Sequence, residues 1–322
     1  MTVDPTPIVG VATGFMAAKQ LFAAGECGLF AALADGPLPA GELAAKTGLP
    51  PRSTRILADV MVGLGLLHFA GDEYRNSPAA AAYLAGGDGL DLRPFLRFWD
   101  TLSYPHWQSY VDSMRSAQPA PFDFSGPRME VFLGGVQRYN SLHALMLAEH
   151  YDFAQHKRLL DLGGLSPAFL TEAATRNPAL HGDFVSTGQL LEFARGAVPP
   201  RLAGRIAVHD ADPLTGPLPA TYDAILLEHV IHRYDAEQNA AILRVARRGA
   251  EDGARLLILD FALDPADGRL LDPLLAGEYL VIDGTVVYPE DEVRGWLDRT
   301  GWRWLETRPL PGSPRVIIAE AA

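Results

Sequence analysis

The pattern of hydrophobic positions changes near Leu159. Before it, apolar residues recur at helical spacing over residues 8–34 and again over 41–67 (GELAAKTGLPPRSTRILADVMVGLGLL). After it, short apolar runs typical of strands alternate with helical segments: LLDLGG, DFVS, RIAVHDAD, YDAILLEHV and RLLILDFAL. That alternation predicts a doubly wound parallel sheet.

The first 90 residues predict a winged helix-turn-helix. Residues 41–67 read as helix, turn and helix, with Ser53 as the cap of the second helix, and residues 68–78 read as a hairpin turning at Gly71 and Asp72. Such a module either reads DNA or mediates packing. Its candidate reading helix offers only Arg52 and Arg55, so we expect dimerisation. The apolar residues over 8–34 exceed what this module can bury alone, which predicts a two-fold dimer.

The fold class expected is therefore α/β. An all-α winged-helix dimerisation domain covers residues 1–90, and a helical linker lining the substrate pocket covers 91–157. A Rossmann-like doubly wound sheet covers 158–322 and ends in an antiparallel hairpin, because residues 303–321 read as two strands around Pro-Gly-Ser-Pro.

Composition narrows the possible partners. With 48% hydrophobic and 20% charged residues the chain is typical of a globular protein, and its net charge of −12 argues against nucleic acid and anionic membranes as partners. Cys27 is the only cysteine, which excludes an intramolecular disulfide and a cysteine-based zinc site. The N-terminus does not read as a secretory signal, and no apolar run reaches the ~18 residues that span a bilayer. We expect a cytoplasmic protein.

The order of these parts resembles the small-molecule O-methyltransferases, which use S-adenosylmethionine (SAM). The resemblance covers nearly the whole chain. It rests on ELAAKTGLPPRSTRILADVMVGLGLL, on LLDLGG and above all on YDAILLEHVIHRYDAEQNAAILRVARRGAEDGARLLILD, which matches the family's strand, catalytic histidine, helix and next strand without a gap.

The nucleotide motif departs from that family. The family's D-x-G-G-G-x-G reads here as Asp161, Leu162, Gly163, Gly164, Leu165, Ser166 and Pro167. Leu165 stands where the family leaves room for the methionyl group, and Pro167 removes an N–H. The acid that grips the ribose in the family is replaced by Ser186. Overpacking and a lost charged hydrogen bond together cost ~2.5–6 kcal/mol, which predicts a degraded SAM site and no cofactor. Alternatively, a rebuilt loop restores the site with Asp161, Asp210 and Asp212.

His232 is the strongest candidate for chemistry. It follows the strand YDAILLEHVI, and ligands bind at the carboxyl ends of such strands. The resemblance implies a general base there, and an imidazole suits proton transfer near neutral pH. The family supports its histidine with two carboxylates, of which Asp260 is retained and the one expected within residues 283–288 is not. Packing roles for both residues stay open.

The helix over 137–151 carries a stripe of Tyr139, His143, Met146 and His150 on one face. The resemblance implies an acceptor pocket here, whereas core packing is the alternative. The expected substrate-binding residues are Trp99, Trp107, Tyr139, Asn140, His143 and Met146. The histidines lack a known zinc spacing, so no metal is expected.

These observations predict an enzyme of bacterial secondary metabolism that acts on an aromatic or polyketide-like molecule. We expect SAM-independent acid–base chemistry at His232: cyclisation, isomerisation, elimination or decarboxylation. A SAM-dependent O-methyltransferase acting on a phenolic hydroxyl is the alternative, and a non-catalytic binding protein or dimer partner is the second.

Overall fold

The computed structural model describes residues 3–123 and 125–322. By its internal contacts the chain forms two compact units. The first comprises the residues up to Gln108 together with Asp123–Tyr139, and the second comprises Ser109–Phe122 with Asn140–Ala322. The segment 91–157, expected as a linker, is thus divided between the two units. The predicted domain boundaries stay a prediction.

The first unit contains the expected winged module. Helices α3 and α4 form the helix-turn-helix, and strands β2 and β3 form an antiparallel hairpin that turns at Gly71 and Asp72, both with positive φ. Strand β1 pairs with β3 to complete a three-stranded sheet. Ser53 does not cap α4, because the helix begins at Pro51 after Pro50 and has no side-chain cap. The elements are α1 (Thr6–Glu26), α2 (Leu29–Ala32), β1 (Leu38–Pro39), α3 (Ala40–Thr47), α4 (Pro51–Gly63), β2 (Leu67–Ala70), β3 (Glu73–Asn76), α5 (Pro78–Tyr83), α6 (Arg93–Phe98), a π-helix (Trp99–Ser103) and α7 (Tyr104–His106).

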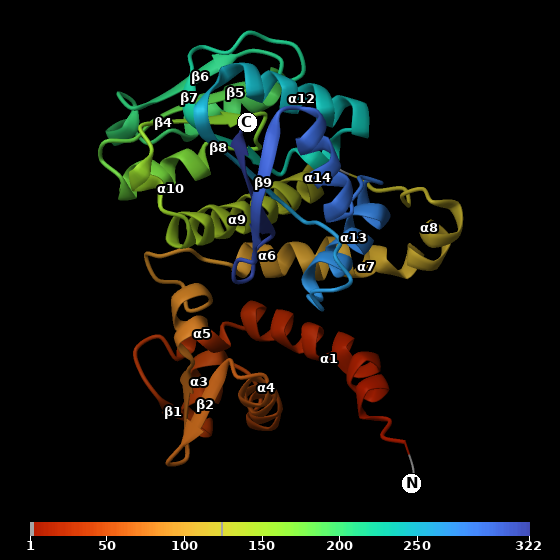
Figure 1. The fold of residues 1–322 in the computed structure, drawn as a ribbon. Coiled ribbons are helices and arrows are strands. Elements are labelled where there is room, and N and C mark those ends of the chain that lie inside the picture. Colours follow the sequence, from red (N-terminus) through yellow and green to blue (C-terminus); the bar gives the residue numbers. More distant parts are fainter. Residues whose placement is uncertain (1–2, 124) are drawn as a thin grey trace. The chain divides into compact units, whose positions relative to one another are not determined.

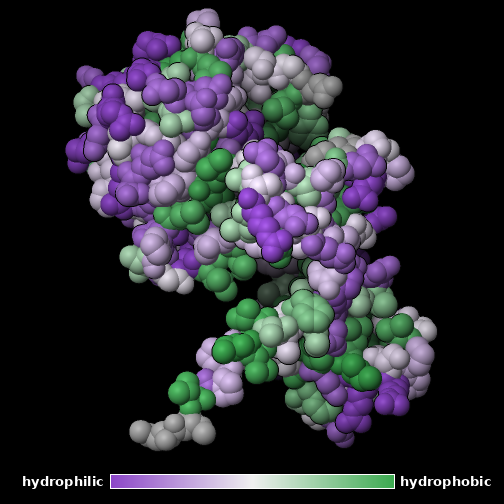
Figure 2. Space-filling view, turned by 90° about the vertical axis from the view of Figure 1, so that its right-hand side faces the viewer, coloured by the Kyte–Doolittle hydropathy of each residue, from purple (hydrophilic) through white to green (hydrophobic). Residues whose placement is uncertain are grey.

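Helix α1 exposes an apolar surface, and Figure 2 shows hydrophobic residues gathered along it. Its exposed large hydrophobic residues are Ile8, Val9, Val11, Phe15 and Met16. By length and composition alone this helix could cross a membrane, so the expectation that no segment reaches that length is wrong. Only 6% of its most apolar window is buried inside the protein. An exposed surface of this kind is typical of an interaction site.

The second unit is built on a seven-stranded sheet of order β6-β5-β4-β7-β8-β10-β9 (Figure 1). The first five strands in that order are parallel, and β10 is antiparallel to both β8 and β9. This confirms the predicted doubly wound sheet with a terminal hairpin. The strands are β4 (Arg158–Leu162), β5 (His181–Ser186), β6 (Ile206–Asp210), β7 (Tyr222–Glu228), β8 (Ala250–Asp260), β9 (Trp302–Arg308) and β10 (Arg315–Ala321).

Helices flank this sheet. The central strands β4 and β7 are buried on both faces, which explains their unbroken apolar runs. The helices are α8 (Tyr110–Ser116), α10 (Ala168–Arg176), α11 (Gly188–Ala197), α12 (Ala236–Gly249), α13 (Leu271–Ile282) and α14 (Glu290–Arg299), while α9 (Gly126–His150) runs through both units. Asp235 begins α12 with a capping box that Gln238 completes. Trp296 and Trp302 fill the core between α14 and the hairpin. The parallel strands therefore deliver their carboxyl ends to one edge, where the candidate residues lie.

Candidate active site

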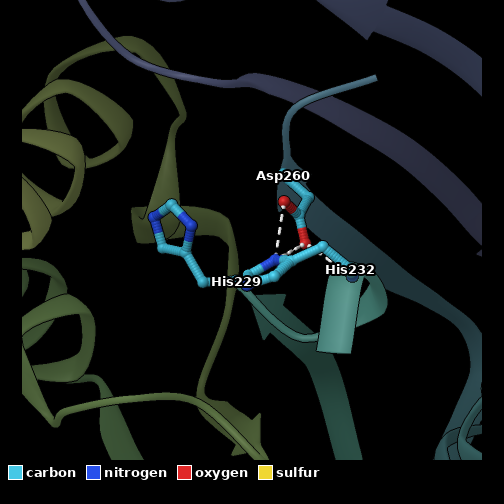
Figure 3. A group of neighbouring side chains, drawn as sticks. All are labelled: His229, His232 and Asp260. Atoms are coloured by element: carbon cyan, nitrogen blue, oxygen red, sulfur yellow. Dashed lines mark hydrogen bonds and ion pairs between the residues drawn. The ribbon is translucent and has the colours of Figure 1, made fainter. Parts of the chain in front are cut away.

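His232 and Asp260 form a hydrogen-bonded pair at the carboxyl ends of β7 and β8. Nδ1 of His232 lies 2.9 Å from Oδ2 and 3.1 Å from Oδ1 of Asp260 (Figure 3). Asp260 is 2% exposed, and although burial favours the neutral acid, the neighbouring His232 holds the pKa of this carboxyl below its usual value. An Nδ1–H donated to the carboxylate leaves the Nε2 lone pair to accept a proton. The pair therefore has the arrangement of an oriented general base.

A second pair of buried histidines lies beside the first. His229 directly follows β7 with a positive φ of 51°, and its Nε2 lies 2.9 Å from Nδ1 of His143 on α9. Burial lowers the pKa of His229 to about 4 and that of His143 well below its usual value. Both rings are therefore neutral near pH 7.

Three potential ligand atoms from His229, His232 and Asp260 lie within 4.8 Å of one another. Figure 3 shows the ring of His229 directed away from Asp260. The imidazole of His232 is hydrogen-bonded to Asp260, and the imidazole of His229 is hydrogen-bonded to His143. The geometry supports a proton-transfer site, and the absence of a metal stays a prediction.

The backbone of the glycine loop after β4 makes hydrogen bonds that the loop's sequence does not show. Gly163 has a φ of 78°, which favours glycine, and its N–H donates to the carbonyl of Val185 at 2.8 Å. Pro167 sits at the N-cap of α10, where no helical hydrogen bond requires its missing N–H. Leu165 is half-buried and uses its N–H in a hydrogen bond to Glu228. Pro167 therefore costs the helix no hydrogen bond.

Glu228 is the functional candidate that the sequence analysis missed. It ends β7, is fully buried, and its Oε1 accepts hydrogen bonds from the N–H groups of Leu165 and Ser166, the latter at 3.2 Å. Burial raises the pKa of Glu228 to about 8, against the lowering effect of those two bonds and of Arg233. The sequence did contain a signal, namely an acid at the end of an otherwise apolar strand. Burying an acid is costly, so such a residue is a candidate for a functional site.

The residues expected to grip the ribose lie on adjacent strands. Ser186 ends β5 and is buried, and it is in register with Asp210, which ends β6 and is exposed. Asp183, the acid three residues before Ser186 on β5, forms ion pairs with Arg158 and His209. A hydroxyl and a carboxylate thus stand side by side at this edge of the sheet, although the carboxylate is not on the strand that the family motif implies.

The six expected substrate-binding residues divide between the two units. In the second unit, Asn140 is buried and donates to Oγ of Ser166 at 3.2 Å, His143 bonds to His229, and Met146 is buried. In the first unit, Tyr139 stacks on Phe95 with ring centroids 4.3 Å apart.

Trp99 belongs to the same aromatic cluster of the first unit. It contacts Phe95 and Phe98 edge-on, and it begins the π-helix, a rare element that is frequent at functional sites. Trp107 follows in a single 3-10 turn and is half-buried. These placements leave the pocket-lining roles of the six residues as predictions.

Comparison with known proteins identifies both parts of the chain. The profile of the O-methyltransferase dimerisation domain matches residues 9–86, and that of the O-methyltransferase domain matches residues 123–303. The chain is 31% identical to the 3-hydroxy-5-methyl-1-naphthoate 3-O-methyltransferase of Streptomyces sahachiroi, covering 99% of this chain and 96% of that protein. It is 26% identical to the tetracenomycin polyketide synthesis 8-O-methyl transferase TcmO of Streptomyces glaucescens, over 98% and 96%.

Among solved structures, the apo form of the SAM-dependent methyltransferase SibL has a TM-score of 0.85 and 27% identity, with 99% of both chains covered. PigF with S-adenosylhomocysteine (SAH) has a TM-score of 0.71 and 25% identity, covering 99% of this chain and all of that one.

These relatives overturn the expectation of SAM-independent chemistry without methyl transfer, and with it the expectation of no cofactor. That prediction took Leu165, Pro167 and Ser186 as losses, and the SAM-dependent and SAH-bound relatives contradict it. The match of both profiles and a 31% identical relative over nearly the full length show that the chain belongs to the O-methyltransferase family.

Proposed function

We propose that the protein is a SAM-dependent O-methyltransferase that methylates a hydroxyl group of an aromatic or polyketide-like small molecule in secondary metabolism. The observation that carries this proposal is the His232–Asp260 pair at the same sheet edge as the glycine loop. The named activities of the relatives, which act on a hydroxynaphthoate and in tetracenomycin synthesis, support the substrate class.

The residues around the loop fit the cofactor. Gly164 has no room for a Cβ, and Oε2 of the buried Glu228 beside it has no hydrogen-bond partner among the described residues. Asp161, Gly163 and Gly164 would hold the methionyl part, and Ser186 with Asp210 would hold the ribose. When bound, SAM supplies the activated methyl group.

The protein's own residues then have to remove the proton from the acceptor hydroxyl. Asp260 keeps Nδ1 of His232 protonated and fixes its ring, so that Nε2 removes the proton from the acceptor hydroxyl. The ring of Tyr279 lies 4.7 Å from that of His232 and limits its movement. His143 and His229, neutral and bonded to each other, lie beside the pair, and the aromatic acceptor packs against Met146.

A panel of hydroxynaphthoates and phenols, with SAH release as the readout, tests this function. We expect the wild-type protein to bind SAM and release SAH, and we expect His232→Asn to slow release by roughly 10²- to 10⁴-fold with unchanged SAM affinity. The matched control is His181→Asn, an exposed histidine at the opposite end of the sheet. Absence of SAM binding would refute the cofactor, and full activity of His232→Asn would refute the role of that residue.

We also propose a homodimer formed through the N-terminal domain, in the cytoplasm. The matching dimerisation profile and the exposed apolar residues of α1 support it. Light scattering should give twice the chain mass, and a monomer at all working concentrations would refute the dimer.

A further inference from the structure

His232 lies in a single 3-10 turn, Ile231–Arg233, between β7 and α12. Hydrogen bonds from later segments hold the backbone of this turn. The side-chain amide of Asn239 on α12 donates to the carbonyl of Ile231 at 2.9 Å, and the N–H of Val286 donates to the carbonyl of His232 at 3.3 Å. A base held in so short a turn takes its position from the contacts that the turn makes with its surroundings.

Arg233, the last residue of the turn, connects it to the glycine loop. Its Nε donates to the carbonyl oxygen of His229 at 2.7 Å, and its Nη2 donates to the carbonyl oxygen of Gly163. Gly163 lies 70 residues earlier in the chain, in the loop that follows β4. One half-buried guanidinium therefore joins the segment that carries the base to the loop at the end of the neighbouring strand.

Both acceptor carbonyls belong to residues with a left-handed backbone. Gly163 has a φ of 78°, and His229 has a φ of 51°. Such a φ is uncommon for a residue with a side chain, and it persists only where surrounding contacts hold it. The bond from Arg233 to the carbonyl of His229 is one such contact, and the bond from the N–H of His229 to the carbonyl of Leu259 at 2.9 Å is another. Arg233 thus stabilises the strained residue that leads into the His232 turn.

The charge of Arg233 has a separate effect. Burial raises the pKa of Asp161 well above its usual value and that of Glu228 to about 8, and the positive charge of Arg233 opposes both shifts. The two hydrogen bonds of the guanidinium nevertheless go to carbonyl oxygens and not to these acids. A planar guanidinium presents its donors in a rigid fork, whereas the ammonium group of a lysine is a point charge on a flexible stem. Position and charge can therefore be separated by experiment.

We propose that Arg233 is a positioning residue for methyl transfer, which holds the His232 turn against the glycine loop and so fixes Nε2 of His232 relative to the bound cofactor. This inference rests on the proposed function. Displacing a reacting group by about 1 Å can cost roughly 100-fold in rate. The loop keeps other anchors without Arg233, because the N–H of Gly163 donates to Val185 and Glu228 accepts from the N–H of Ser166. Losing Arg233 should therefore affect the rate more than the cofactor affinity.

Three measurements on Arg233 variants test the proposal, with the hydroxynaphthoates and phenols as acceptors. Arg233→Ala should lower kcat for SAH release about 10- to 100-fold, while SAH affinity by calorimetry stays within about threefold of wild type. Guanidinium ion added at millimolar concentration should restore part of that kcat. Arg233→Lys, which keeps the charge but not the fork, should stay at least about tenfold slower than wild type. Arg244→Ala, at an exposed arginine of α12, is the matched control and should change neither quantity.

The possible outcomes separate this inference from the proposed function. Wild-type protein that releases SAH with none of these acceptors would overturn the proposed function itself. An active wild type with an unchanged kcat in Arg233→Ala would overturn the positioning role alone. Full activity of Arg233→Lys would show that charge suffices, and equal losses of kcat and SAH affinity would show that Arg233 merely holds the loop; either result refutes the proposal. Thermal unfolding checks the fold, and the guanidinium measurement compares one Arg233→Ala sample with itself, so it stands even if that variant is less stable.

Discussion

Replacing Gly164 by alanine should disrupt the cofactor loop through steric overlap alone. Gly164 does not have a positive φ, so the backbone itself tolerates alanine. The added Cβ would lie 2.3 Å and 2.4 Å from oxygens of Asp161 and Glu228, where ordinary contact begins at 3.4 Å. Each oxygen would have to move by about 1 Å, and neither acid has exposed surface into which it could swing.

The expected loss of cofactor-binding free energy in Gly164→Ala follows from these contacts. Overpacking of a buried site costs ~1–3 kcal/mol. Moving Glu228 also weakens its bonds to the N–H groups of Leu165 and Ser166, and a hydrogen bond to a charged group contributes ~1.5–3 kcal/mol. A combined loss of about 3 kcal/mol, taken from cofactor binding, corresponds to roughly 100-fold in affinity.

The assay is SAH titration together with thermal unfolding. Gly196→Ala is the matched control, because Gly196 lies in α11 with nothing within 4 Å of its added Cβ. That change should leave SAH affinity intact and raise stability by about 0.5–1 kcal/mol. Wild-type SAH affinity and an unchanged Tm in Gly164→Ala would show that the loop and the two acids do not lie as described, and would refute the reasoning.

Two further predictions concern the histidines. Asp260→Asn should slow methyl transfer by at least about 10²-fold at unchanged SAH affinity, because an amide no longer fixes the Nδ1–H tautomer of His232, whereas exposed Asp252→Asn should have no effect; equal rates would contradict the pair's role. The pKa of His229 falls from its ordinary 6.5 to about 4 in the folded protein, so the unfolded state takes up the proton first and stability decreases as pH falls from 6.5 to about 4. The loss due to this residue is roughly 3 kcal/mol. His229→Asn, which suits the positive φ, should flatten this part of the urea-unfolding stability curve, and an unchanged pH slope would argue against the buried neutral imidazole.

The site was only partly accessible from sequence. His232 and Asp260 were named as candidates because each stands at the end of an apolar strand and because the family resemblance implies a histidine and a supporting carboxylate there. Glu228 was overlooked although it closes the strand that precedes His232. Nothing local shows that its oxygen is used by the amides of Leu165 and Ser166, more than 60 residues away in the chain. The wrong conclusion about SAM came from treating Leu165, Pro167 and Ser186 as losses.

The sequence by itself determined the alternation of strands and helices, the hairpin around Pro311 and Pro314, and the winged module, because hydrophobic periodicity and turn residues act over a few positions. Only the tertiary structure decided the path of the glycine loop and the pairing of His143 with His229, which are 86 residues apart. It also decided that Pro167 starts a helix without loss. The physical reason is that a loop's backbone conformation depends on donors and acceptors brought by other strands, and these are set by the packing of the whole sheet.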